Sequence, residues 1–291
     1  MEVIRDIAEL RDWRESVAFD ARRVGFVPTM GNLHAGHLAL IDHAKRRADT
    51  VVVSVFVNPL QFEDPDDLAR YPRTEERDLE LLERAGVAAV FLPTEPELYP
   101  HGQKDIVRVD AGPLGERLEG ATRPGHFTGV ATVVTKLFNL VRPDVAVFGE
   151  KDAQQVAVIR RLVADLDMSV ELAIEPTHRE PDGLAISSRN RFLDAEQRRQ
   201  APAVHRALKR AAESLAGGHT VAATLAGARH WLTQQGFVVD YLVYCDDERF
   251  EEQTRLVTHG RLLVAARLGR VRLIDNLAVH SPHPASVGSD R

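Results

Sequence analysis

The sequence has one cysteine, Cys245, among 291 residues. A single cysteine cannot form a disulfide within the chain, and it suits the reducing environment of the cytoplasm. No apolar run approaches the roughly 20 residues that a membrane-spanning helix needs. The first residues, Met1-Glu2-Val3-Ile4-Arg5-Asp6, are charged and lack the apolar centre of a signal peptide. These absences predict a cytoplasmic protein without a membrane span.

An excess of positive charge is also lacking. Lysine and arginine number 37 against 43 aspartates and glutamates, a formal charge of −6. This balance argues against general nucleic-acid binding, which usually needs a basic surface, but it allows a small anionic ligand held by a local cluster of cations. The single cysteine and the absence of an HExxH motif argue against a zinc site. The chain is long enough for two domains, and its composition is that of an ordinary globular protein.

Apolar runs alternate with helical patterns through the first 175 or so residues. Buried strands are expected at 24–28, 50–58, 87–92, 144–149 and 169–174. Helices are expected at 35–48, 74–85, 129–140 and from Glu150 to about Asp165, with a short strand and a helix over 2–18 and irregular structure over 93–125. This alternation implies right-handed crossovers and a parallel sheet covered by helices on both faces.

The pattern changes after residue 177, where Pro176, Pro181 and Gly183 mark a connection. Beyond it, helices are expected at 194–216 and 220–235, followed by strands at 238–245, 261–267 and 271–275. This order predicts a smaller α+β domain over 178–280. The tail 281–291 is expected to be disordered.

The sequence between the strand at 24–28 and the helix at 35–48 carries the strongest chemical pattern. Pro28 is expected to end the strand ladder, and His34-Ala35-Gly36-His37 opens the helix. Free N–H groups at a helix N-terminus can hold phosphate, and Gly31 and Gly36 let a nucleotide approach the backbone. His34 and His37 fall on one face and can donate to phosphate oxygens. The alternative is two ordinary surface histidines at a helix start.

Other polar groups follow strand ends, where open α/β sheets bind their ligands. Gln61 follows the second core strand and either binds a hydroxyl or carboxylate or caps a loop. Lys151 lies in the first turn of the helix after 144–149 and either meets phosphate or is an ordinary surface lysine. Asp152 and Gln155 share a face of that helix, and Asp152 could instead cap its N-terminus.

Two loops add further cations. Ser187-Ser188-Arg189-Asn190 reads either as a phosphate clamp or as a turn with an N-cap serine. Arg123-Pro124-Gly125-His126 reads either as a phosphate contact or as a solvated turn.

Taken together, these motifs resemble the pantoate–β-alanine ligase family of the HxGH nucleotidylyltransferase superfamily. The resemblance is strong over about 24–193. It is carried by Pro28-Thr29-Met30-Gly31 with His34-Ala35-Gly36-His37, Phe56-Val57-Asn58-Pro59 with Gln61-Phe62, Tyr71-Pro72-Arg73-Thr74, Pro124-Gly125-His126-Phe127, Gly149-Glu150-Lys151-Asp152 with Gln154-Gln155, and Asp182-Gly183-Leu184-Ala185 with Ser187-Ser188-Arg189-Asn190.

The resemblance implies a Rossmann-like domain over 1–177 that binds ATP and pantoate, a C-terminal lid domain over 178–280, and a homodimer. It implies ATP- and Mg²⁺-dependent condensation of (R)-pantoate with β-alanine through a pantoyl adenylate. Another adenylyltransferase of the superfamily, or a nucleotide-binding sensor that has lost catalysis, remains as an alternative.

Site residues carry over by motif. The residues implied to contact ATP are Met30, Gly31, Asn32, Leu33, His34, Ala35, Gly36, His37, Gly149, Glu150, Lys151, Asp152, His178, Ile186, Ser187, Ser188 and Arg189. The residues implied to act in catalysis are His37 as proton donor, with His34, Lys151, Ser187, Ser188 and Arg189.

Gln61 and Gln155 are implied to bind pantoate, with Gln61 also beside β-alanine. The Mg²⁺ ligands stay unassigned, with Asp152 as a weak candidate. The sequence departs from the family at Ile186, usually Met, and at His178, often Val. An apolar swap of similar size at Ile186 should cost little.

Overall fold

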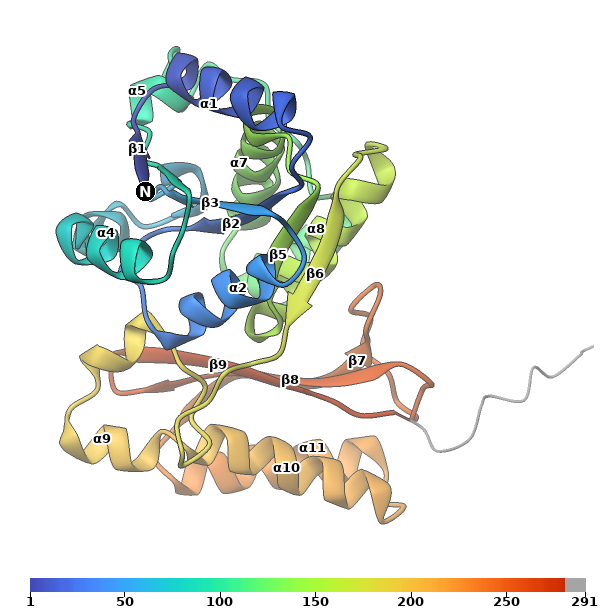
Figure 1. Cartoon of the computed structure of the whole chain (residues 1–291). Coiled ribbons are helices and arrows are strands. Elements are labelled where there is room, and N and C mark those ends of the chain that lie inside the picture. The colour runs from blue at the N-terminus through green and yellow to red at the C-terminus, as the bar shows by residue number, and fades with distance from the viewer. Residues whose placement is uncertain (281–291) are drawn as a thin grey trace, which may run out of the picture. The chain divides into compact units, whose positions relative to one another are not determined.

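The computed structural model describes residues 1–280, which form two compact units (Figure 1). The first unit comprises Met1–Glu150 and Gln154–Thr177, and the second comprises Lys151–Ala153 and the residues from His178 onward. The tail expected at 281–291 lies outside the described residues.

A six-stranded sheet with all neighbours parallel forms the centre of the first unit, in the order β1-β4-β3-β2-β5-β6. The predicted α/β parallel sheet is therefore confirmed. Its strands are β1 (Glu2–Ile4), β2 (Val24–Thr29), β3 (Thr50–Val55), β4 (Ala89–Phe91), β5 (Val145–Gly149) and β6 (Glu171–Glu175).

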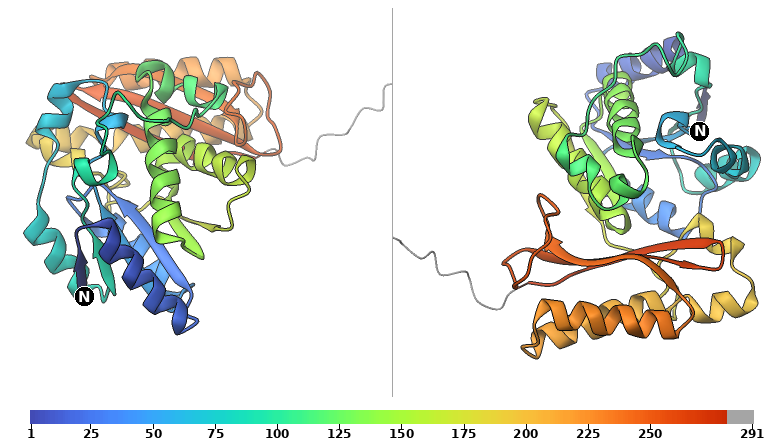
Figure 2. Two further views of the ribbon diagram at one scale, coloured as in Figure 1. Left: turned by 90° about the horizontal axis from the view of Figure 1, so that it is seen from above. Right: turned by 180° about the vertical axis from the view of Figure 1, so that it is seen from behind.

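Helices cover both faces of this sheet, as predicted (Figure 1 and Figure 2). Phe26 of β2 packs in one apolar cluster with residues of α1, α7 and α8, while Val27 packs in another with residues of α2 and α4. Successive strand residues point to opposite faces, so one continuous apolar run supplies two cores. The helices are α1 (Ile7–Phe19), α2 (Ala35–Lys45), α3 (Pro65–Arg70), α4 (Glu75–Arg84), α5 (Glu95–Leu98), α6 (Glu119–Thr122), α7 (His126–Val141) and α8 (Ala153–Asp165).

Pro28 does not end strand β2, contrary to the expectation from the sequence. The strand continues to Thr29 and pairs with β3 along its whole length, with Pro28 opposite Ser54. Pairing with β5 on the other side stops at Phe26. Backbone groups of alternate residues point to alternate neighbours, and the Thr29 carbonyl accepts the Phe56 N–H on the β3 side. Pro28 therefore points toward β5, beyond the end of that ladder, where its missing N–H costs no hydrogen bond.

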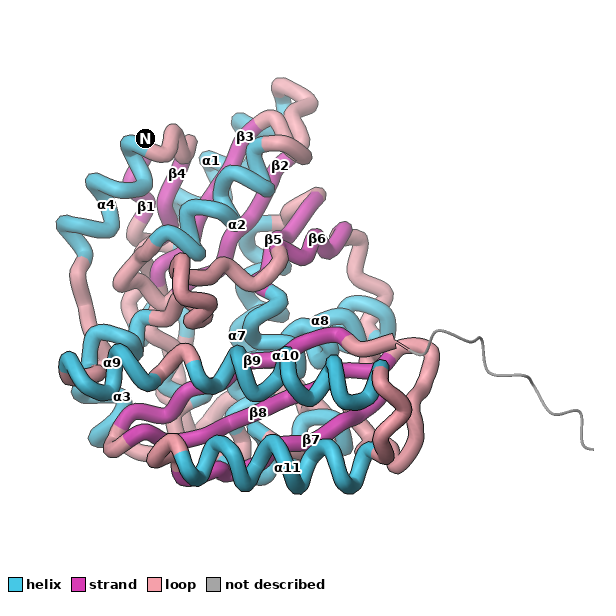
Figure 3. Tube along the Cα trace, turned by 90° about the horizontal axis from the view of Figure 1, so that it is seen from below, coloured by secondary structure: helices cyan, strands magenta, loops and turns pink. Residues whose placement is uncertain are grey.

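The second unit contains a three-stranded antiparallel sheet in the order β7-β8-β9, with helices along one face (Figure 3). The predicted smaller α+β architecture is confirmed. Its strands are β7 (Val238–Asp246), β8 (Gly260–Leu268) and β9 (Val271–Ala278), and its helices are α9 (Ala195–Gln200), α10 (Ala203–Ala216) and α11 (Val221–Gln234).

The helix expected over 194–216 is two helices. Helix α9 ends at Gln200 and α10 begins at Ala203, with Pro202 between them as the N-cap residue of α10. A proline lacks the N–H that a continuous helix would use and its ring collides with the preceding turn, so the helix restarts there. A smaller difference concerns Glu150, which opens a 3₁₀ turn, Glu150–Asp152, ahead of α8.

None of the helices formed by residues 1–280 combines the length and the apolar character needed to cross a membrane.

Candidate functional site

The loop between β2 and α2 places two histidines at a helix N-terminus. His34 is the N-cap residue of α2, with extended backbone angles, and its N–H donates to Nδ1 of His37 at 3.3 Å. The two rings stack with their centroids 4.0 Å apart and their planes 28° from parallel. Because Nδ1 of His37 accepts this bond, a neutral His37 carries its proton on Nε2, which is then a donor.

Gly36 packs closely against the His34 ring of the histidine stack. A Cβ at this position would come within 3.1 Å of Cε1 and Nδ1 of the His34 ring. Such a contact is tighter than ordinary van der Waals packing, so with a larger residue the His34 ring would have to shift by a few tenths of an ångström. The small residue between the two histidines is thus explained by local packing as well as by ligand access.

Asp78 of α4 holds the backbone of this loop, and the sequence reasoning missed it. Its carboxylate accepts the N–H groups of Asn32 and Leu33, each at 2.8 Å, and the hydroxyl of Thr74 at 3.1 Å. The side chain is 2% exposed. A signal was present in the sequence, since Asp78 lies four residues before Leu82 and so falls on the buried face of the helix expected there.

Gln61 is oriented by a buried polar network at the end of β3. Its Oε1 accepts from Nδ2 of Asn58 at 3.0 Å, and its Nε2 donates to the Met30 sulfur at 3.1 Å. Oδ1 of Asn58 accepts in turn from the Tyr99 hydroxyl at 2.8 Å. Burial raises the pKa of Tyr99, so the hydroxyl stays protonated and remains a donor. Asn58 therefore fixes Gln61 with its amide N–H groups facing Met30.

The cationic loop 123–126 binds the same segment. Nη2 of Arg123 lies 3.1 Å from the Gln61 carbonyl oxygen, and Nδ1 of His126 lies 2.8 Å from it. The sequence left open whether this loop contacts phosphate or is a solvated turn. In the structure, its Arg123 and His126 side chains hold the Gln61 main chain.

Gln155 lies in the first turn of α8 beside a buried neighbour. Gln154 is 3% exposed, donates to the carbonyls of Leu114 and Arg117 at 2.9 and 2.8 Å, and accepts the Glu119 N–H at 3.1 Å. Gln154 thus anchors the segment 114–119, while Gln155 remains partly exposed.

In the second unit, Lys151 and Asp152 lie side by side. Nζ of Lys151 is 3.6 Å from the Asp152 carboxylate, and the Lys151 side chain is 19% exposed against 46% for Asp152. An ammonium in this partly buried turn is a strong electrostatic partner for phosphate, because solvent screening is reduced there.

Ser187 and Arg189 also belong to the second unit. Oγ of Ser187 accepts the Arg189 N–H at 3.3 Å, so Ser187 caps the 3₁₀ turn Ser188–Phe192. The turn with an N-cap serine, one of the two interpretations from the sequence, is therefore present. Ile186 and Ser188 are partly exposed, and His178 is exposed. The cap shapes the turn, and the partly exposed side chains are accessible to a ligand.

The second unit also contains a buried ion pair between Arg179 and Asp275. Nη1 and Nη2 of Arg179 bind the two carboxylate oxygens of Asp275 at 2.7 and 2.9 Å. Burial alone would raise the pKa of Asp275, but the neighbouring His205 ring and the hydrogen bonds and charge of Arg179 outweigh it and hold that pKa below its usual range.

This shift predicts a pH-dependent loss of stability in Asp275→Asn. A carboxyl group whose pKa is lower in the folded than in the unfolded protein stabilises the fold at pH values above its unfolded pKa, about 3.9. This stabilisation is lost as the pH falls through the pKa of the folded state. Asp275→Asn should cost about 3 kcal/mol at pH 7. The difference in the free energy of unfolding between the variant and the parent should narrow progressively below about pH 4. Urea unfolding at several pH values measures this difference. An equal gap at pH 7 and pH 2.5 would contradict the assignment.

Comparisons with known proteins cover nearly the full chain. Residues 2–278 match the family described as pantoate-beta-alanine ligase. The chain is 50% identical over 282 residues to a pantothenate synthetase of Chromohalobacter salexigens, covering 97% of this chain and 100% of that one. It is also 50% identical over 281 residues to one of Pseudomonas aeruginosa, covering 96% and 99%.

Solved structures are similar as well. A pantothenate synthetase from Thermus thermophilus matches with a TM-score of 0.89 and 48% identity, over 97% of this chain and 100% of that one. A pantoate-beta-alanine ligase from Francisella tularensis, complexed with beta-gamma ATP and beta-alanine, matches with a TM-score of 0.81 and 34% identity, over 96% and 97%.

A parallel sheet whose second strand leads through His34-Ala35-Gly36-His37 into a helix is the arrangement that the resemblance to the HxGH nucleotidylyltransferase class implies. Within that class, the chain belongs to the pantoate–β-alanine ligase family.

Proposed function

We propose that this enzyme condenses (R)-pantoate with β-alanine, using ATP and releasing AMP and pyrophosphate. A pantoate carboxylate oxygen attacks the α-phosphorus of ATP, and the bond to the β-phosphate breaks. The β-alanine amine then attacks the acyl carbon of the adenylate, AMP leaves with the C–O bond electrons, and the amine loses a proton. The observation that carries the proposal is the family match over 2–278 together with the stacked His34–His37 pair.

In the first unit we assign ATP to the loop from Met30 to His37, together with Gly149 and Glu150. The N-terminus of α2 supplies N–H groups and a favourable dipole for phosphate. His37, which carries its proton on Nε2, donates to the phosphate oxygens as negative charge grows on them. His34 lies against it and contributes from the same side.

In the second unit we assign the phosphate contacts to Lys151, Ser187, Ser188 and Arg189. An ammonium and a guanidinium neutralise the leaving pyrophosphate, and the hydroxyls add neutral donors. The resemblance implies that residues of both units act on the same ATP, and on this basis we propose that the second unit acts as a lid.

We assign pantoate to Gln61 and Gln155, with Gln61 also contacting β-alanine. The orientation of Gln61 set by Asn58 presents amide N–H groups, which suit a carboxylate or hydroxyl oxygen of a hydroxy acid. An amide suits a hydroxy acid better than a second phosphate, so this arrangement favours pantoate over the phosphorylated acceptor of another adenylyltransferase.

Asn58→Leu should therefore weaken pantoate binding selectively. Without the Asn58 amide, Gln61 loses the partner of its Oε1 and can rotate. We expect the KM for pantoate to rise about tenfold with the KM for ATP within about twofold, on the scale of a lost hydrogen bond to a charged group. Initial rates with each substrate varied separately measure this. Equal rises in both KM values would contradict the role of Asn58 in orienting Gln61.

We propose that Mg²⁺ enters the site bound to ATP. Among residues 1–280 there is no group of three or more histidine, cysteine, aspartate or glutamate side chains able to hold a metal. Mg²⁺ at phosphates usually keeps several waters and uses one or two carboxylates, so partly exposed Asp152 suffices as the protein ligand. When bound, the ion would offset the negative charge of the phosphate oxygens.

We further propose a cytoplasmic homodimer. The cytoplasmic assignment rests on the single cysteine, Cys245, which suits a reducing compartment. The homodimer is proposed because the resemblance to the pantoate–β-alanine ligase family implies it. Sedimentation at micromolar concentration measures the oligomeric state, and a monomer there would refute the dimer.

The deciding experiment measures pyrophosphate release from ATP–Mg²⁺ with and without pantoate, and then AMP and amide formation on adding β-alanine. Pantoate-dependent pyrophosphate followed by β-alanine-dependent AMP supports the proposal. ATP binding without pantoate-dependent pyrophosphate would contradict it and favour a different acceptor or a nucleotide sensor.

A further inference from the structure

A short hairpin in the second unit leads directly into the segment Ser187–Arg189. The Glu180 N–H donates to the Leu184 carbonyl at 2.8 Å, and Arg179 bridges Ala185 across the two arms. The outgoing arm continues into the proposed phosphate-binding residues. The position of this hairpin therefore determines where those residues begin.

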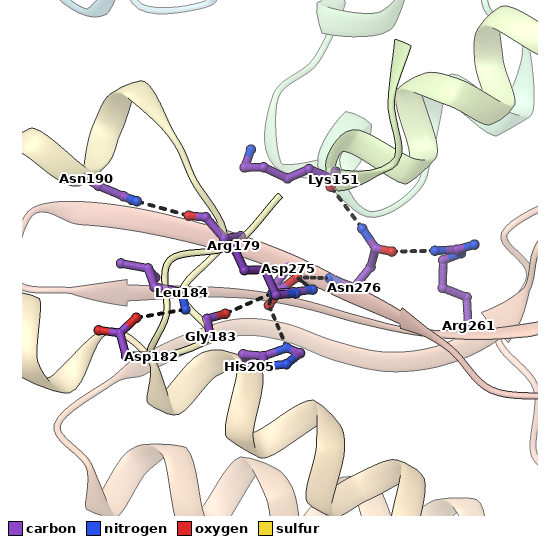
Figure 4. Close-up of polar contacts among 11 residues, drawn as sticks. Lys151, Arg179, Asp182, Gly183, Leu184, Asn190, His205, Arg261, Asp275 and Asn276 are labelled. Atoms are coloured by element: carbon purple, nitrogen blue, oxygen red, sulfur yellow. Dashed lines mark hydrogen bonds and ion pairs between the residues drawn. The ribbon is translucent and has the colours of Figure 1, made fainter. Parts of the chain in front are cut away.

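The Asp275–Arg179 ion pair ties the hairpin to strand β9. Asp275 is 4% exposed, and its guanidinium partner comes from the incoming arm. Nη1 of Arg179 also donates to the Gly183 carbonyl at the turn, at 3.2 Å (Figure 4). One buried pair thus fixes both the arm and the turn of the hairpin.

His205 of α10 closes the other side of the same cluster. Its Nδ1 lies 3.5 Å from the Asp275 carboxylate. Its ring covers Gly183, where φ is +93° and a Cβ would come within 2.9 Å of the ring. A side chain at Gly183 is excluded both by this contact and by the backbone angle. Helix, hairpin and strand therefore pack as one block around Asp275.

The next residue along β9 reaches the opposite face of the sheet, since successive strand side chains alternate. Asn276 is 4% exposed, and its Nδ2 donates to the main-chain carbonyl of Lys151 at 3.0 Å (Figure 4). Its Oδ1 accepts from Arg261, whose charge is balanced by Asp247 at 2.6 Å. Asn276 thus holds Lys151, the second proposed phosphate contact, while its neighbour Asp275 holds the hairpin that leads to Ser187–Arg189.

We propose that Asp275 and Asn276 are positioning residues for ATP, with Asp275 placing Ser187–Arg189 through the hairpin and Asn276 placing Lys151. The inference rests on the proposed function, because it takes these side chains as the phosphate contacts. Two adjacent residues on one rigid strand fix both segments in register. This matters because a shift of about 1 Å in a catalytic group can cost about 100-fold in rate.

Asn276→Asp tests the inference with little change in shape. The carboxylate keeps an acceptor for Arg261 but loses the donor and turns a negative oxygen toward the Lys151 carbonyl. We expect the KM for ATP to rise about tenfold and pantoate-dependent pyrophosphate release to slow about tenfold, within the range for a displaced catalytic group. The KM for β-alanine, which is used in the second step, should stay within about twofold.

Asp275→Asn tests the hairpin, and Asp240→Asn is its matched control. Asp240 is a carboxylate of the same sheet with a side chain 12% exposed, and it pairs with Arg272 at 2.7 Å and with Arg267 at 3.4 Å. Both substitutions remove a charge from a largely buried arginine pair. Only Asp275→Asn should weaken binding of β,γ-methylene ATP with Mg²⁺, by about tenfold in calorimetric titration. Thermal unfolding of each variant reports its stability.

Two results would overturn the inference. One is a folded Asn276→Asp variant with parental analogue affinity and an unchanged KM for ATP. The other is an Asp240→Asn variant that weakens analogue binding as much as Asp275→Asn does. If Asp275→Asn does not fold, Asn276→Asp decides the matter. A parent enzyme without pantoate-dependent pyrophosphate release refutes the proposed reaction instead, and analogue binding still decides the positioning role.

Discussion

His37→Ala should reduce the rate of pantoate-dependent pyrophosphate release by about 100-fold or more, with most of the loss in kcat. In the proposed reaction, the Nε2 donor of His37 meets charge that grows on the phosphate oxygens only as the α-phosphorus is attacked. A group that binds the transition state more tightly than the ground state affects kcat rather than KM. Lys151→Ala should slow the reaction by a similar factor, because it removes the partly buried ammonium that we propose neutralises the leaving pyrophosphate.

Each substitution has a matched control in the chain. His43 lies on the same helix as His37 and pairs with Glu175 at 2.8 Å, so His43→Gln should leave the rate within about threefold, as expected for a site outside the chemistry. Lys151→Met keeps the aliphatic stem of the lysine and separates loss of charge from loss of packing. Rapid-quench single turnovers measure adenylate formation directly. Near-parental rates in both His37→Ala and Lys151→Ala would refute these assignments.

The positions of the site loops could be predicted from sequence because they follow from strand ends. A continuous apolar run identifies a buried parallel strand, and the residue types after it identify the polar edge. The loop after β2 and Gln61 after β3 were located in this way. Local chemistry also explains why the helix expected over 194–216 is interrupted at Pro202. The proline could have been recognised from the sequence as a helix breaker.

Contacts between distant parts of the chain could not be predicted. Pro28 stays in its strand because β5 stops pairing early, and no local pattern reports the length of a neighbouring strand. Asp78 binds the loop at Asn32 from 46 residues away. Asn58 and Tyr99 likewise meet across 41 residues. Single-sequence periodicity places such side chains on a face but does not name their partners.

Asp78→Asn should damage both the stability and the chemistry of the enzyme. The carboxylate accepts two main-chain N–H groups with separate oxygens, so an amide must turn its NH₂ group toward one of them. Losing a buried bond to a charged group costs about 1.5–3 kcal/mol, and leaving a donor unpaired adds to it, so we expect a loss of about 3 kcal/mol.

The same change should slow adenylate formation by about 100-fold, because the loop that leads into the His34–His37 pair loses its anchor and the imidazoles move. Thr74→Val is the control, since it removes only the hydroxyl bond to Asp78 and should cost about 1 kcal/mol with a small effect on rate. Urea unfolding and single-turnover pyrophosphate release measure the two effects. If Asp78→Asn lost stability but kept the parental rate, Asp78 would support the fold without positioning the histidines, and the catalytic geometry would have to be fixed within the first turn of α2 by His34, Gly36 and His37 themselves.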